Sequence, residues 1–256
     1  MRVAGSLALI AAGLALGAAA WARPDAGARL YVRPKPVVFG IWFNPQSPLF
    51  ANNVALERAI NYALDRPALV RAWGRYAGHP AASLIPPTVP GYDGRSAYPL
   101  AGPDLVAARA LAEGNLRDGK VTLGVYYAPF LRPVAAEVKR DLAAIGLDVD
   151  VFVIAGICPH ACPQPDMTFT GWGADYPDPI SALQQFATPR QLQHAALLRG
   201  DLRRQVFAQI DYDVMSQAPP VAPFMAANAA MLVSARTHCF HWNPWYGVDL
   251  NALCVR

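Results

Sequence analysis

The stretch VTLGVYYAPFLRPVAAEVKRDLAAIGLDVDVFVI, residues 121–154, contains the pattern that decides the fold. Residues 121–127 are apolar and rich in β-formers, residues 132–145 have helical periodicity and end before Gly146, and residues 147–154 again have strand composition. A strand, a helix and a strand in this order form a right-handed crossover that makes the two strands parallel neighbours in one sheet. The stretch therefore predicts an α/β protein with this helix packed on one face of the sheet.

The residues before this unit predict a buried strand and several short helices. Residues 37–43 form an apolar run that ends at Asn44-Pro45, and Asn52 or Asn53 is a suitable N-cap for a helix through residue 64. Further helices are expected over residues 68–73 and 103–111. Between them, the proline-rich residues 79–92 predict a loop that lies on the surface or lines a cleft.

After residue 154, the sequence predicts one more strand, two helices and an irregular tail. We expect the strand over residues 167–172, and helices over 180–186 and 201–215. Residues 219–224 contain three prolines, so we expect them to form at most an edge strand. The tail, residues 229–256, suggests one or two short strands.

The first residues have the pattern of an export signal. Arg2 is followed by an apolar run to Ala20, and Ala20-Trp21-Ala22 fits the small-x-small pattern that precedes a signal-peptidase cut. We expect a signal peptide over residues 1–22, a leader over 23–36 and one domain over 37–256. The alternative is an uncleaved membrane anchor, because the run approaches the length of a spanning helix.

Composition and charge narrow the class of protein. More than half of the residues are hydrophobic and only 16% are charged, which is typical of a globular chain. The net charge of +4 is scattered, with no basic helix face, so nucleic acid is not an expected partner.

The four cysteines fit an oxidising compartment. We favour pairing Cys239 with Cys254 and Cys158 with Cys162, because each pair closes a loop in which the Cα atoms can approach. The alternative is a zinc site, although the spacing matches no familiar zinc motif; its ligands would be Cys158, His160, Cys162, Cys239 and either His238 or His241. We expect no metal and no cofactor.

An ordered set of motifs resembles the extracellular solute-binding proteins of family 5, the dipeptide- and oligopeptide-binding subunits of bacterial ABC importers. The set covers residues 37 to the C-terminus: FN at 43–44, LERAINYALDR at 56–66, GHPA at 78–81, IPP at 85–87, PGY at 90–92, AARALA at 107–112, DLAAIGL at 141–147 and GWGADYPDP at 171–179. The resemblance implies a mixed sheet flanked by helices, as in a type II periplasmic-binding-protein lobe.

The resemblance also implies a function and partners. It suggests an exported, non-enzymatic component of an ABC transporter, periplasmic or extracellular, that binds peptides or similar small solutes and contacts permease subunits. Family members are about twice this length and bind ligand between two lobes, whereas the resemblance here covers only the second lobe. We therefore interpret the chain as a truncated relative, a domain-deleted relative or an incomplete gene product. A complementing first lobe or self-association would cover the open half of the cleft.

In peptide-binding relatives, the aspartate three residues after the tryptophan of this motif holds the ligand's α-amino group, and the tryptophan lines the cleft. The resemblance assigns these roles to Asp175 and Trp172. An aspartate in a low-dielectric cleft pairs well with an ammonium group. The alternative is that Trp172 belongs to the core and Asp175 to a turn, with Asp178 as the N-cap of the helix that follows.

Other aromatic residues and other classes of protein remain as alternatives. Trp242, Trp245 and Tyr246 either face the cleft or pack under the tail, and Asp65 and His79 are expected to be structural rather than ligand contacts. A hydrolase is disfavoured because the chain has no Gly-x-Ser-x-Gly, His-Glu-x-x-His or glycine-rich phosphate loop. A structural or interaction protein made from a transporter lobe is the third class, with an exposed apolar wall for its partner.

Overall fold

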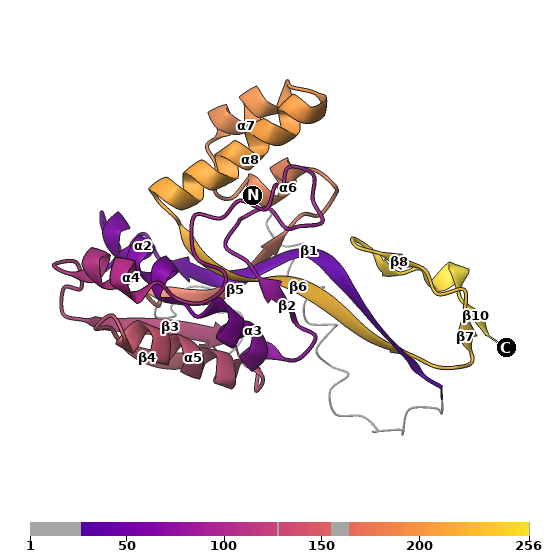
Figure 1. Cartoon of the computed structure of the whole chain (residues 1–256), viewed down its shortest axis with the longest axis horizontal. Helices are drawn as coiled ribbons and strands as arrows, with labels where there is room; N and C mark the ends of the chain where they lie inside the picture. Colours follow the sequence, from indigo (N-terminus) through magenta and orange to yellow (C-terminus); the bar gives the residue numbers. More distant parts are fainter. Residues whose placement is uncertain (1–26, 127, 155–163, 256) are drawn as a thin grey trace.

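In the computed structural model, the residues described are 27–126, 128–154 and 164–255. They form a six-stranded mixed sheet with the order β2-β6-β1-β5-β3-β4, two small two-stranded sheets, and helices on both faces of the large sheet (Figure 1). The strands of the large sheet are β1 (Arg29–Phe43), β2 (Gly78–Pro80), β3 (Lys120–Tyr126), β4 (Asp148–Ile154), β5 (Met167–Gly173) and β6 (Val221–Val233). The helices are α2 (Val54–Ala63), α3 (Arg66–Trp73), α4 (Leu105–Ala112), α5 (Leu131–Ala143), α6 (Pro179–Leu183), α7 (Pro189–Ala196) and α8 (Gly200–Gln217).

The predicted β-α-β unit is confirmed. β3 pairs with β4 in parallel from Lys120 opposite Asp148 to Tyr126 opposite Ile154, and α5 connects the two strands. β5 joins the other edge of β3 in parallel, while β1 runs antiparallel to both β5 and β6. The α/β class and the mixed sheet flanked by helices are therefore as expected.

The two faces of the sheet bury two separate hydrophobic clusters. One cluster lies under α2, α3, α4 and α5 and includes Leu56, Leu142 and Phe224, all fully buried. The other lies under α6, α7 and α8, and it includes Phe207 and Trp172. Figure 1 shows α6, α7 and α8 together on one side of the sheet. Because side chains alternate along a strand, β1 supplies Val38 to the second cluster and Ile41 to the first.

The strand β1 begins earlier than the apolar run from Val37 indicates. It starts at Arg29, and its first part pairs with the end of β6, from Arg29 opposite Val233 to Pro34 opposite Asn228. This two-stranded ribbon extends away from the sheet (Figure 1). The polar residues 29–36 were expected to be a leader because a solvated ribbon lacks the buried face that makes a strand recognisable in sequence.

Residues 221–224 begin β6, which continues to Val233 and is longer than the sequence predicts. β6 lies between β2 and β1, but β2 pairs only with residues 225–227, so residues 221–223 are paired with β1 alone. Pro223 is tolerated there because the pairing of β1 with β6 shifts register between Phe39 and Gly40, and prolines within sheets concentrate at such bulges. A local propensity argument does not detect a bulge that the partner strand creates.

Part of the loop over residues 79–92 is buried, which corrects the expectation of a surface or cleft-lining loop. Leu84 and Ile85 are fully buried. Their N–H groups donate to the two carboxylate oxygens of Asp211 on α8, at 2.8 and 3.1 Å. This side chain replaces the water that the loop backbone would otherwise need.

Most helix boundaries agree with their sequence signals, but α7 was not expected, and Asn53, at the N-cap position of α2, makes no side-chain capping hydrogen bond. Asp65 caps α3 by accepting from the Ala68 N–H at 2.9 Å, and α3 ends at Gly74. Asp104 caps α4 in the same way. α7 begins with a capping box in which Thr188 and Gln191 bind each other's backbone N–H groups.

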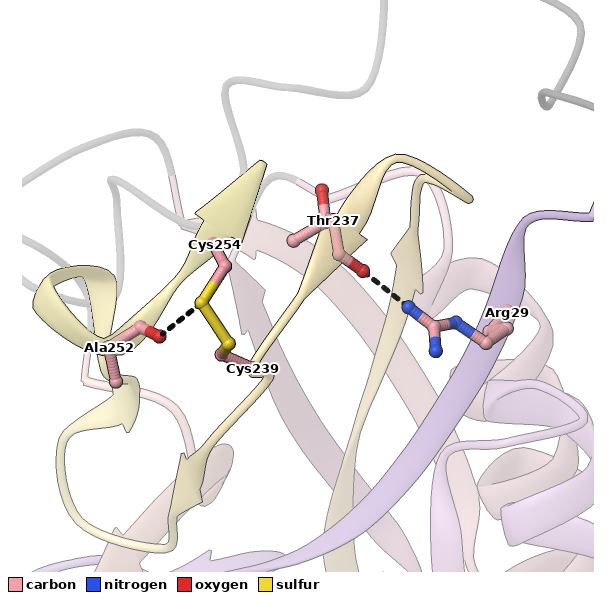
Figure 2. Close-up of a disulfide and its surroundings, with 5 residues drawn as sticks. All are labelled: Arg29, Thr237, Cys239, Ala252 and Cys254. Carbon is pink, nitrogen blue, oxygen red and sulfur yellow. Dashed lines mark hydrogen bonds between the residues drawn. A yellow bond between two sulfur atoms is a disulfide. The ribbon is translucent and has the colours of Figure 1, made fainter. Parts of the chain in front are cut away.

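The C-terminal tail forms a small segment at the far end of the ribbon. Its short strands are β7 (Thr237–His238), β8 (Trp242–Asn243), β9 (Gly247–Val248) and β10 (Cys254–Val255), with a 3-10 turn η1 (Leu250–Ala252). The predicted Cys239–Cys254 disulfide is present, with the Cα atoms 5.4 Å apart, and Arg29 donates to the Thr237 carbonyl (Figure 2).

The disulfide removes Cys239 from the alternative zinc ligand set. Within the described part of the chain, no group of three or more candidate ligands is placed to hold a metal ion. Cys158, His160 and Cys162 lie outside the described residues, as does the expected signal peptide, so these predictions stay predictions. Among residues that the structure describes, no helix has the length and apolarity needed to cross a membrane.

Candidate functional site

The candidate site begins at the carboxyl end of β5, where two glycines flank Trp172. A Cβ atom on Gly171 would lie 2.7 Å from the Phe39 ring, and one on Gly173 would lie 2.2 Å from the Pro36 carbonyl oxygen. Gly173 therefore requires glycine because the β1 backbone approaches too closely for a side chain, whereas at Gly171 a side chain would require the Phe39 ring to move. The glycines of the Gly-Trp-Gly pattern allow β5 to pack tightly against β1.

Trp172 is a buried residue of the cluster under α6, α7 and α8. Its side chain is 5% exposed, its Nε1 donates to the Leu84 carbonyl at 2.9 Å, and its ring meets Phe186 edge-on at 5.3 Å. With the indole N–H already bonded and the residue nearly fully buried, little of Trp172 remains for a ligand. Trp172 therefore fixes the buried loop at Leu84, and a role as a cleft wall stays a prediction.

Asp175 lies in the bend between β5 and α6, and its side chain is exposed. Its N–H donates to Ser181 Oγ at 2.8 Å, while in the described part of the chain no hydrogen bond or ion pair to its carboxylate is found. The preceding residue, Ala174, donates its N–H to the Pro36 carbonyl at 2.9 Å. Two successive main-chain N–H groups, those of Ala174 and Asp175, are thus hydrogen-bonded, and Asp175 is exposed to solvent.

Asp178 caps α6, as the sequence predicts. Its Oδ1 accepts from the Ile180 N–H at 2.9 Å, and Pro179 occupies the first helical position. Arg203 on α8 contacts both carboxylate oxygens of Asp178, at 3.0 and 2.8 Å. The side chains of this pair are about one quarter exposed, so the ion pair joins α6 to α8 without being fully desolvated.

Two residues that support the site were missed by sequence reasoning. Ser181 is 1% exposed and had no signal beyond its position in the first turn of a helix. Asp211, 6% exposed, binds residues more than a hundred positions earlier in the chain, so no local pattern reveals it. Burial raises the pKa of Asp211 to about 7, although the two backbone N–H groups act in the opposite direction.

The other candidate aromatic residues lie away from Trp172 and Asp175, in the tail. Trp242 and Trp245 are partly buried and Tyr246 is 87% exposed. His79 is exposed on β2, where its backbone pairs with Ala226. A hollow of about 500 Å³ at the α7–α8 junction is open to solvent; it is lined by residues 196–200 and by Arg203, the partner of Asp178.

The sequence model of the family described as bacterial extracellular solute-binding proteins, family 5 (middle region) matches residues 6–193. The chain belongs to this family, which is one of solute-binding proteins rather than enzymes. No curated protein matches the chain in a sequence search.

Solved structures of peptide-binding proteins share the fold. The putative peptide-binding protein AppA from Clostridium difficile superposes with a TM-score of 0.76 at 18% identity, over 91% of this chain and 53% of its own. DppA from Helicobacter pylori, solved with the peptide STSA, superposes with a TM-score of 0.71 at 20% identity, over 90% of this chain and 49% of its own. The dipeptide-binding protein from Pseudoalteromonas sp. SM9913, solved with Met-Leu, superposes with a TM-score of 0.71 at 20% identity, over 98% of this chain and 53% of its own.

The chain spans about half the length of these structures. At this level of identity the similarity concerns the fold, which is that of a periplasmic-binding-protein lobe. The predicted family and fold class are confirmed.

Proposed function

We propose that this chain is the ligand-binding lobe of an exported ABC-transporter component, and that Asp175 binds the free α-amino group of a peptide. The observation that carries the proposal is the geometry of Asp175. Its carboxylate is exposed at the end of β5, without a hydrogen bond or ion pair to another described residue, while the backbone around it is fixed. Such a carboxylate is available to an ammonium group.

The role of Trp172 in this proposal is mainly to hold the site. Its indole anchors Leu84, and its ring packs against Phe186 in the cluster under α6, α7 and α8. The membership of a solute-binding family and the neighbours solved with STSA and Met-Leu support peptides as the ligand class.

The partners in this proposal are ABC permease subunits and a second lobe that closes over Asp175, supplied by another polypeptide or by a second copy. Export through a signal peptide over residues 1–22 belongs to the same proposal. The extracellular setting of the family supports it, as does the disulfide between Cys239 and Cys254.

The test compares the unmodified protein with Asp175→Asn in calorimetric titrations with trialanine and N-acetyl-trialanine. Asp175→Asn should weaken binding of trialanine, because an amide cannot compensate the ammonium charge, and should leave the acetylated peptide nearly unaffected. The control is Asp150→Asn, which removes the charge of another exposed aspartate, on β4.

The size of the affinity loss for trialanine in Asp175→Asn indicates whether a second lobe covers the site. On the open lobe the pair is solvated, and losing it should cost up to about fivefold in affinity. If a covering lobe desolvates the pair, the loss should reach about thirtyfold or more. Equal binding of trialanine by both proteins would remove Asp175 from the site.

A further inference from the structure

We propose that Ser181 and the Asp178–Arg203 ion pair position Asp175, so that its carboxylate is held in place and kept free for a cationic ligand group. The ligand part of this inference rests on the proposed function above. The positioning itself does not, and it can be measured without any ligand.

Ser181 fixes the backbone of Asp175. Its Oγ accepts the Asp175 N–H at 2.8 Å, and its own N–H donates to the Asp178 carbonyl at 3.1 Å. Because Ser181 is 1% exposed, water cannot readily replace the hydroxyl as the acceptor. Asp175 is therefore tied to the first turn of α6 rather than to a freely moving loop.

The ion pair engages the positive charge of Arg203 with Asp178. Arg203 contacts both carboxylate oxygens of Asp178, and its guanidinium lies 4.8 Å from the centre of the Phe207 ring. This arrangement commits Arg203 to the aspartate three residues after Asp175. Without the charge of Asp178, Arg203 would lose its carboxylate partner, and its uncompensated positive charge would oppose the binding of an ammonium group at Asp175.

These contacts produce a preorganised anionic site. Pro36 holds the chain at Ala174 and Ser181 holds it at Asp175, so little backbone ordering remains to be done on binding. Ser181 and Asp178 are positioning residues, since they act on the ligand only through Asp175.

The first experiment measures hydrogen exchange of the Asp175 amide in Ser181→Ala. Exchange should accelerate by at least about threefold, because the acceptor of that N–H is lost. The matched control is Ser83→Ala, which removes another buried serine hydroxyl on the same side of the sheet, one that donates to the Ile85 carbonyl at 3.1 Å. This control should leave the Asp175 amide unchanged. An unchanged amide in Ser181→Ala as well would overturn the positioning role.

The second experiment measures the ratio of the affinities for trialanine and N-acetyl-trialanine. The ratio should fall at least about threefold in Ser181→Ala and in Asp178→Asn, where asparagine retains the ability to cap α6. Asp104→Asn, the same change at the N-cap of α4, should leave the ratio unchanged. A merely structural loss would lower both affinities together.

The outcomes separate this inference from the proposed function. If the unmodified protein binds the two peptides equally or not at all, the assignment of Asp175 to ligand binding fails, and the exchange experiment still decides the positioning. If exchange accelerates in Ser181→Ala while a preference for the free amine persists undiminished, Ser181 supports only the fold and the inference is wrong.

Discussion

At the scale of single residues, the buried carboxyl of Asp211 makes stability depend on pH. Burial raises its pKa to about 7, whereas an aspartate in the unfolded chain titrates near 4. The folded protein therefore retains this proton to higher pH than the unfolded chain does. Its contribution to the free energy of unfolding is largest below about pH 4, falls as the pH rises to about 7, and stays low above that.

We expect Asp211→Asn to reduce this pH dependence. Between pH 4 and pH 7 the difference attributable to Asp211 is at most roughly 4 kcal/mol. Urea unfolding at several pH values measures it. The free energy of unfolding of the variant should still depend on pH, because burial also raises the pKa values of Glu57 and Asp141 to about 7. An identical pH profile for the variant and the unmodified protein would show that Asp211 is not the group responsible.

Residue-level prediction from sequence succeeded where the partner is nearby in the chain. Asp178 was recognisable as an N-cap because its partner is the N–H two residues later. Ser181 and Asp211 were missed because their partners are defined by tertiary packing. Trp172 lies between these cases: its apolar character predicts burial, but nothing local indicates that its N–H binds Leu84.

At the scale of elements, the C-terminal tail is held together by a disulfide rather than by a hydrophobic core. Within the described residues, no buried hydrophobic residue occurs after Ala227. The segment from β7 to β10 is held by the Cys239–Cys254 disulfide, by stacking of Tyr31 on Phe240, and by Arg29. Small segments without a core depend on such staples.

We expect the double substitution Cys239→Ser and Cys254→Ser to loosen the tail and leave the main unfolding transition unchanged. The loop closed by the disulfide spans 15 residues, for which chain entropy gives about 3 kcal/mol of local stabilisation. Limited proteolysis should cut the variant between residues 237 and 255, while the free energy of unfolding measured in urea stays within about 0.5 kcal/mol of the unmodified protein. A large fall in that free energy would mean that the tail supports the sheet.

Element prediction was accurate for the β-α-β unit and incomplete for β6, whose continuation to Val233 was missed. The unit is local, and its strands are recognisable because their buried faces are apolar. β6 is aligned by β1, more than 180 residues away, through pairs such as Ile41 with Ala222. Its proline, Pro223, lies in the part that β2 does not pair with, and the pairing of residues 225–227 between β1 and β2 was not visible in the sequence.

At the scale of the whole molecule, one sheet couples two hydrophobic clusters. Leu56 belongs to one and Phe207 to the other, and both are fully buried. Because β1 contributes side chains to both clusters, loss of either should destabilise the entire lobe rather than half of it.

We expect Leu56→Ala and Phe207→Ala to lower the free energy of unfolding by about 2–5 and 3–5 kcal/mol respectively, each in a single transition. Far-UV circular dichroism and tryptophan fluorescence should give coincident urea curves. Val106→Ala on α4, where the side chain is 83% exposed, is the control and should change little. Two separated transitions would show that the clusters unfold independently.

The ribbon of β1 and β6 connects distant parts of the molecule mechanically. A single strand runs from Arg29 at the tip to Gly40, where an added Cβ would lie 2.9 Å from the Trp172 ring. At about 3.3 Å per residue, these eleven steps correspond to a lever of roughly 36 Å. The pairing with β6 is interrupted between Pro34 and Val38, so the irregularity that sets the direction of the ribbon lies just before Val38, the residue opposite Trp172. Over such a length, a difference of a few degrees in the bend near the tryptophan would correspond to a displacement of several ångströms at the tip.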